Sequence, residues 1–185
     1  MVERALAGGA AFLQYRNKSA DAALRNEQAR ALLRLARASR VPLIINDDVV
    51  LAAAIDADGA HVGRDDAEVA TARKLLPGKL LGASCYASLD TARQAVACGA
   101  DHVAFGSVFC SVTKPAANRA PLSLFADAAM LGVPMVAIGG ITTQNAHLAI
   151  SAGADCLAVI SDVFSAPDIT GRVAEYRKLF EAHHT

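Results

Sequence analysis

Seven apolar segments of this chain have the composition of buried β-strands, and a helical pattern follows each of them. The apolar segments are rich in Val, Ile and Leu, and they end at Gly or polar residues. Such a regular alternation predicts an α/β fold with a parallel sheet. The predicted strands are Ala10–Arg16, Pro42–Asp47, Gly59–Gly63, Leu80–Cys85, His102–Val108, Pro134–Gly140 and Cys156–Ser161.

The segments between the predicted strands carry helix start and stop signals. Asp21 and Ser88 have the side chains of N-caps. Glycines stand just past four predicted C-termini, where a left-handed residue ends a helix, at Gly78, Gly99, Gly132 and Gly153. The predicted helices are Asp21–Ser39, Val49–Ile55, Ala67–Leu76, Ser88–Cys98, Leu122–Leu131, Thr143–Ala152 and Ile169–His183.

Both an open doubly wound sheet and a closed barrel fit this alternation. An open sheet gathers its site at one switch point, whereas a barrel uses the ends of all its strands. Polar residues suited to binding follow nearly every strand here, and no linker divides the chain. We therefore predict one (β/α)8 TIM-barrel domain over residues 1–185.

The N-terminal segment does not fit a complete barrel. Val2–Ala7 followed by Gly8 and Gly9 has the pattern of a helix end with its glycine cap, so the chain starts on a helix that should follow a strand. Barrels of this type typically run to about 250 residues. We expect an N-terminally shortened form that lacks the first strand.

The overall composition argues against several classes of partner. A formal net charge of zero argues against nucleic acid and anionic membranes. Apolar runs stay below the roughly 20 residues of a membrane span, and the N-terminus lacks a signal-peptide pattern, so we expect a cytoplasmic protein. The spacing of the four cysteines suits neither a zinc nor a redox motif.

The polar residues at two strand ends suit a polyphosphate and a metal ion. Gln14, Arg16 and Lys18 occupy every second position, so in a strand their side chains point to the same side. Two cations and an amide on one side can hold a polyphosphate. The alternative is a solvated strand end without a ligand. Asp47 and Asp66 end neighbouring strands and can share one Mg²⁺, the alternative being capping of the next helix. Asp48 and Asp65 fit that capping role.

A second anion site is expected at the later strand ends. Ser111, Thr113 and Lys114 offer hydroxyls and a cation in a long loop, unless that loop is merely flexible. Gly139–Ile141 and Ile160–Ser161 end the last two strands, the usual phosphate site of such barrels.

These motifs together resemble the thiamine phosphate synthase family through almost the whole chain. They are Gln-x-Arg-x-Lys at 14–18, Asn46–Asp47, His-Val-Gly-x-x-Asp ending at Asp66, Gly82-x-Ser84, Gly-x-x-Phe-x-Ser-x-Thr-Lys at 106–114, Ala-Ile-Gly-Gly-Ile at 137–141 and Ala-Val-Ile-Ser at 158–161.

The resemblance implies a reaction and a set of site residues. Hydroxymethylpyrimidine diphosphate would be joined to a thiazole phosphate, with Mg²⁺ on Asp47 and Asp66 and with Arg16, Lys18 and Lys114 assisting loss of diphosphate. The thiazole nitrogen would then capture the pyrimidine cation. The pyrimidine diphosphate would contact Gln14, Tyr15, Arg16, Asn17, Lys18, Asn46, Ser84 and Lys114, and the thiazole phosphate Ser111, Val112, Thr113, Gly140, Ile160 and Ser161.

Alternative functions remain at this stage. A related thiazole tautomerase tends to carry His near position 107, where this chain has Ser107, and to lose the metal carboxylates. A catalytically silent phosphate-binding barrel fragment, or another phosphate-binding barrel such as an isomerase of sugar or indole phosphates, is also compatible with the fold. Ser111 and Cys110 replace the Thr and Pro frequent in the family, His61 and His102 are interpreted as structural, and a homo-oligomer stays open.

Overall fold

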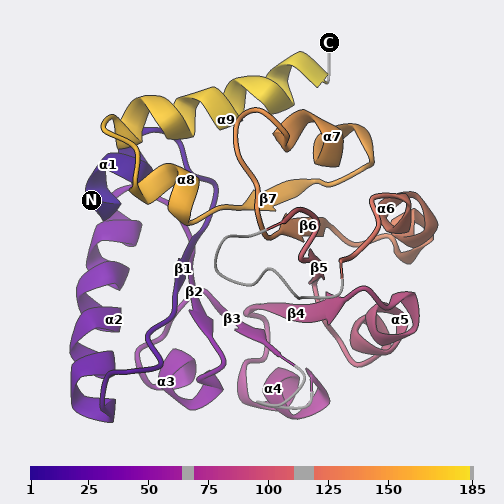
Figure 1. The fold of residues 1–185 in the computed structure, drawn as a ribbon. Helices are drawn as coiled ribbons and strands as arrows, with labels where there is room; N and C mark the ends of the chain where they lie inside the picture. The colour runs from indigo at the N-terminus through magenta and orange to yellow at the C-terminus, as the bar shows by residue number, and fades with distance from the viewer. Residues whose placement is uncertain (64–68, 111–118, 184–185) are drawn as a thin grey trace.

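The computed structural model describes residues 1–63, 69–110 and 119–183. Within these residues, seven parallel strands form one sheet whose spatial order is the order of the chain (Figure 1). The strands are β1 (Leu13–Tyr15), β2 (Leu43–Asn46), β3 (Gly59–Val62), β4 (Leu80–Tyr86), β5 (His102–Gly106), β6 (Met135–Ile138) and β7 (Cys156–Ala158).

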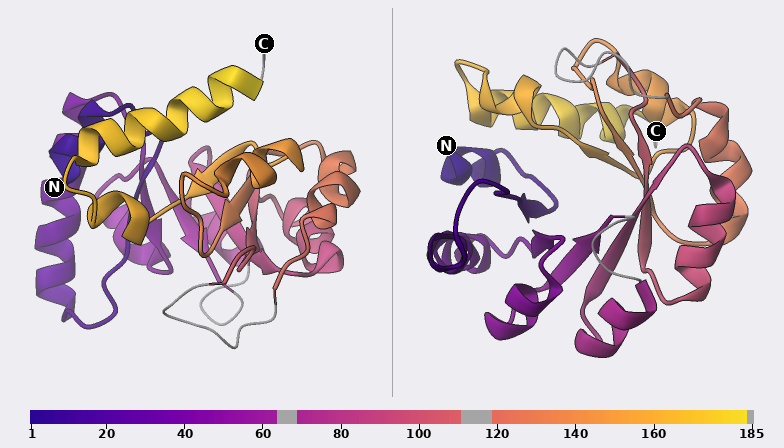
Figure 2. Two further views of the ribbon diagram at one scale, coloured as in Figure 1. Left: turned by 45° about the horizontal axis from the view of Figure 1, so that its top comes forward. Right: turned by 60° about the horizontal axis from the view of Figure 1, so that its bottom comes forward.

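Helices connect successive strands and lie around the outside of the curved sheet (Figure 2). None of those in the described part of the chain is long and apolar enough to cross a membrane. They are α1 (Val2–Ala7), α2 (Ala22–Ala38), α3 (Val49–Ala54), α4 (Val69–Leu75), α5 (Leu89–Ala97), α6 (Ser123–Ala128) with the 3₁₀ turn η1 (Ala129–Leu131), α7 (Ala146–Ser151), α8 (Ser161–Phe164) and α9 (Ile169–His183).

The helix ends follow the predicted signals. Asp21 accepts a hydrogen bond from the Leu24 N–H at 2.8 Å, and Ser88 accepts one from the Thr91 N–H at 3.1 Å. All four glycines predicted beyond helix C-termini have positive φ. These predictions are confirmed because caps depend on local chain geometry alone.

Three predicted strands run at least two residues past the observed ones at their C-terminal ends, and the last of them does so furthest. We expected a strand over Cys156–Ser161, but β7 ends at Ala158, and Ser161 begins the short helix α8. The apolar run 156–160 therefore does not continue as a strand to its end, and the backbone at Ile160 is helical, with φ −119° and ψ −74°. In an apolar run this short, periodicity alone does not distinguish a strand from a helix.

The predicted α/β fold with a parallel sheet is confirmed, and the seven strands of the described residues form a half-barrel. Each strand pairs with its neighbours in the chain, and β1 and β7 form the two ends of the sheet. Every residue of β3 is buried, whereas the three residues of β7 are only partly buried, and Phe12, just before β1, is 48% exposed. Closure between β1 and β7 is not among the pairings of the described residues.

The N-terminal helix α1 packs against the first part of the C-terminal helix α9 (Figure 1). The Thr170 hydroxyl donates to the Arg4 carbonyl at 2.9 Å. Gly8 lies so close to Val173 that a Cβ would stand 2.6 Å from its side chain. The predicted N-terminal helix is thus confirmed, and its glycine is needed for the close approach.

Candidate functional site

The described candidate residues lie at the carboxyl ends of the strands. Because every strand pair is parallel, these ends share one edge of the sheet. Four candidate segments, from β1, β2, β4 and β6, and the turn after β7 belong to this edge. Asp66 and the segment Ser111, Val112, Thr113 and Lys114 lie outside the described residues.

The predicted alternation after β1 is observed. Gln14, Arg16 and Lys18 are exposed, whereas Tyr15 is buried. The Tyr15 hydroxyl donates to Gln28 Oε1 of α2 at 2.7 Å. The two kinds of side chain therefore face opposite ways, as strand geometry requires.

Asn17 holds the loop that carries Lys18. Its Oδ1 accepts hydrogen bonds from the Ser19 N–H at 3.1 Å and the Ala20 N–H at 3.2 Å, and its Nδ2 donates to Gln28 Oε1 at 3.0 Å. An Asn side chain that satisfies its own loop in this way restricts the loop backbone. The position of Lys18 is therefore stabilised by its neighbour.

A cation and a carboxylate meet between β1 and β2. Lys18 Nζ lies 3.3 Å from Asp47 Oδ2, and the Asp47 side chain is only 21% exposed. Asp47 has a φ of +67°, and its N–H donates to the His61 carbonyl at 2.9 Å. Asp48 instead caps α3 through the Leu51 N–H at 2.9 Å, which confirms its predicted role. Asn46 is the last residue of β2, directly before this pair.

The chemistry of Asp47 suits Mg²⁺, a hard cation that prefers carboxylate oxygen. Within the described residues no group of three His, Cys, Asp or Glu side chains could hold a metal ion. Asp66, the second predicted ligand, lies outside them. Mg²⁺ would therefore need Asp66, or substrate oxygens and water, beside Asp47.

A buried histidine contacts Ser84 on β4. His61 Nε2 is 2.9 Å from Ser84 Oγ, and His61 is only 7% exposed. Burial, with a further contribution from His102, lowers the pKa of His61 to about 4, so its ring is neutral at neutral pH. Gly82 makes room, because a Cβ there would stand 2.1 Å from His102 Nε2. The sequence, from which His61 was interpreted as structural, did not predict this contact.

Two glycines form the turn after β6. Gly139 and Gly140 have φ values of +101° and +65°. A Cβ on Gly140 would stand 2.4 Å from the Cys110 carbonyl oxygen. Asn145 holds the turn from the other side, because its Nδ2 donates to the Gly140 carbonyl at 3.0 Å and its Oδ1 accepts from the Thr142 N–H at 2.9 Å.

Ile160 and Ser161 follow β7 and are both exposed. Asp162, next in the chain, is bound through its carboxylate to Arg172 and Tyr176 of α9. Sequence reasoning missed both Asn145 and Asp162. The sequence does contain a signal for Asp162, because its partners Arg172 and Tyr176 are four residues apart and so share one face of a helix.

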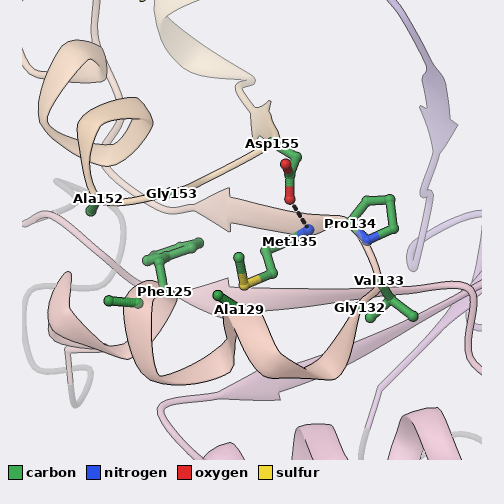
Figure 3. Close-up of a pocket in the computed structure, with 10 residues that line it drawn as sticks. Phe125, Ala129, Gly132, Val133, Pro134, Met135, Ala152, Gly153 and Asp155 are labelled. Atoms are coloured by element: carbon green, nitrogen blue, oxygen red, sulfur yellow. Dashed lines mark hydrogen bonds between the residues drawn. The ribbon is translucent and has the colours of Figure 1, made fainter.

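A cavity of about 470 Å³ lies away from this edge (Figure 3). Its lining is mainly apolar and includes Phe125 and Met135, the first residue of β6. Asp155 also lines it, but its Oδ2 already accepts a hydrogen bond from the Met135 N–H at 2.8 Å. The cavity opens near the amino ends of β6 and β7, opposite the candidate residues, so it is not part of the candidate site.

Comparisons with known proteins agree on one family. The family model described as thiamine monophosphate synthase matches residues 1–163. Thiamine-phosphate synthases of Methylobacillus flagellatus and Aromatoleum aromaticum are each 56% identical to the chain, over 96% and 98% of its length and 86% and 88% of theirs. The structure of thiamine phosphate pyrophosphorylase from Pyrococcus furiosus superposes with a TM-score of 0.90 at 36% identity, covering 98% of this chain and 88% of that one.

Proposed function

Since this chain belongs to the thiamine monophosphate synthase family and is accordingly a transferase, we propose that it joins hydroxymethylpyrimidine diphosphate to a thiazole phosphate, giving thiamine phosphate and diphosphate. The observation that carries the proposal is the pairing of Lys18 with Asp47 at the carboxyl edge of the sheet, within a match to a family relative over 98% of the chain. A cation beside a carboxylate suits a diphosphate that arrives with a divalent metal ion.

The exposed side chains after β1 would bind the pyrimidine diphosphate. Gln14 would orient the ring, while Arg16 and Lys18 would contact the diphosphate, and Asn46 and Ser84 would contribute further polar contacts. Lys114, by the family pattern, adds a third cation. Fixed cations stabilise the charge that develops on a departing diphosphate.

Mg²⁺ would be held by Asp47 and Asp66, and when bound it supplies positive charge to the diphosphate oxygens. Lys18 then contacts both Asp47 and the substrate. The Lys18 loop is restrained by Asn17, so the cation is positioned before the substrate arrives.

The remaining candidate residues would bind the thiazole phosphate. In the chemical step, the C–O bond between the pyrimidine methylene and the diphosphate breaks, and its electron pair leaves with the diphosphate. The lone pair of the thiazole nitrogen then forms the new C–N bond. A general base is not required in this scheme. Thiazole phosphate contacts are proposed for Ser111, Val112, Thr113, Gly140, Ile160 and Ser161.

The sheet is proposed to be that of a single-domain (β/α)8 barrel, of which the described residues form seven strands. Supporting this, the sheet order follows the chain, and the outer strand β7 has no fully buried residue. A cytoplasmic location stays a prediction, as does assembly into a homo-oligomer. The tautomerase alternative has little support, because the Ser107 hydroxyl donates to the Phe109 carbonyl at 2.7 Å and so serves its own turn.

The test is the formation of thiamine phosphate from the two phosphorylated halves, with Mg²⁺ or with EDTA. Asp47→Asn removes the carboxylate charge while Asn tolerates the positive φ, and we expect loss of product. Asp48→Asn is the matched control, because Asn also caps helices well. Asp66→Ala should behave like Asp47→Asn. If product forms at an unchanged rate with EDTA and in both metal-site variants, the proposed role of Mg²⁺ is wrong. If the folded parent protein forms no product, the proposed function is wrong.

A further inference from the structure

Asp162 is a shielded carboxylate directly after the exposed turn at Ile160 and Ser161. Its side chain is only 16% exposed. Its Oδ2 accepts hydrogen bonds from Arg172 Nη1 and from the Tyr176 hydroxyl, each at 2.7 Å. Both donors come from one face of α9.

The carboxylate joins three segments of the structure. Burial by itself would raise the pKa of Asp162, but hydrogen bonds from Tyr176, Arg172 and the backbone of Thr143 outweigh it and hold the pKa below its usual value. Asp162 is therefore charged at neutral pH, with its charge compensated as shielded charges require. Thr143 belongs to the loop that follows the Gly139–Gly140 turn, so α8, α9 and this loop meet at one side chain.

The helix that carries Asp162 is too short to be stable alone. α8 has four residues, fewer than helix nucleation and growth require. By contrast, α9 has fifteen residues and packs against both α1 and α7 (Figure 1). The position of α8 therefore depends on tertiary contacts, which are the buried Val163 and the polar contacts of Asp162.

The facing turn has its own restraint. Asn145 binds both the Gly140 carbonyl and the Thr142 N–H. Thr143 follows directly, so the Asp162 carboxylate contacts the same restrained loop from the side of β7. The turn after β6 and the turn after β7 are thus connected through Asp162.

We propose that Asp162 is a positioning residue for the thiazole phosphate subsite, setting Ile160 and Ser161 against the Gly140 turn. The inference rests on the proposed function, because that function assigns these residues to the phosphate. Asp162 does not contact the substrate; it acts through the backbone of α8 and of the Thr143 loop.

The experiment measures the affinity for thiazole phosphate alone by calorimetry, and then the two KM values and kcat at saturation. Asp162→Ala should weaken thiazole phosphate binding and raise its KM on the order of tenfold, the effect of losing charged hydrogen bonds. Asp162→Asn and Tyr176→Phe should give smaller shifts in the same direction, and they keep most of the packing. The KM for the pyrimidine diphosphate should not change.

Glu175→Gln is the matched control. It removes an ion pair with the same Arg172, at 3.2 Å from Nε, but Glu175 is 58% exposed. We expect wild-type affinity. The non-phosphorylated thiazole alcohol should bind equally weakly to the parent protein and to every variant, and thermal unfolding should show each variant folded at the assay temperature.

The outcomes separate this inference from the proposed function. Normal turnover with unchanged thiazole phosphate affinity in Asp162→Ala would overturn the inference and leave the function intact. Weakened binding in Asp162→Ala without turnover by the parent protein would uphold the inference and overturn the function. Equal changes in both KM values, or no binding of thiazole phosphate by the parent protein, would overturn the inference.

Discussion

Gly140→Ala should both destabilise the protein and weaken the thiazole phosphate subsite. Gly140 has a φ of +65°, where an L-residue costs about 1–2 kcal/mol. An added Cβ would stand 2.4 Å from the Cys110 carbonyl oxygen. A backbone oxygen cannot rotate away as a side chain can, so the turn would have to shift, at a further cost of about 1–3 kcal/mol. Gly132→Ala is the matched control, because Gly132 has nearly the same φ, +67°, with nothing within 4 Å of its Cβ position.

The measurement is urea unfolding of the two variants beside the parent protein. The difference between them isolates the steric contribution, about 1–3 kcal/mol in the free energy of unfolding, or roughly 2 to 12 °C in Tm for a chain of this size. In kinetic assays only Gly140→Ala should raise the KM for thiazole phosphate. Equal destabilisation by both substitutions would refute the steric argument, since backbone strain at positive φ would then account for the whole loss of stability in Gly140→Ala.

Two further predictions concern the other end of the site. Lys18→Met should lower kcat about 10²- to 10³-fold, the loss expected when one group that stabilises the transition state is removed. It should change the free energy of unfolding by less than about 1 kcal/mol, because the ion pair of Lys18 with Asp47 is partly solvated. Reduced stability with unchanged turnover would contradict this prediction. His61 is neutral when folded, so its contribution to stability is complete above pH 6.5 and is lost as the pH falls toward 4, by about 3 kcal/mol. Urea unfolding of His61→Gln should depend less steeply on pH over that range, with His102 accounting for part of the remaining slope.

Much of the fold could be predicted from local patterns. All seven strands occur where their apolar segments predicted them, because strands that bury most of their residues need apolar runs. The alternation of Gln14 and Arg16 with Tyr15 follows from the geometry of any strand. The boundary of β7 was wrong, because the apolar run through Ile160 hides the short helix that follows.

The sequence by itself determined the order of strands and helices, the edge at which polar residues gather, and the family, because these depend on short-range patterns and on motifs in fixed order. Only the tertiary structure decided which of those residues touch. Ser84 and His61 are 23 residues apart in the chain, and Tyr176 and Asp162 are 14 apart, yet each pair is in hydrogen-bond contact. Strand register and helix packing create such contacts, since both are set by how complete elements bury their faces together rather than by any local run of residues.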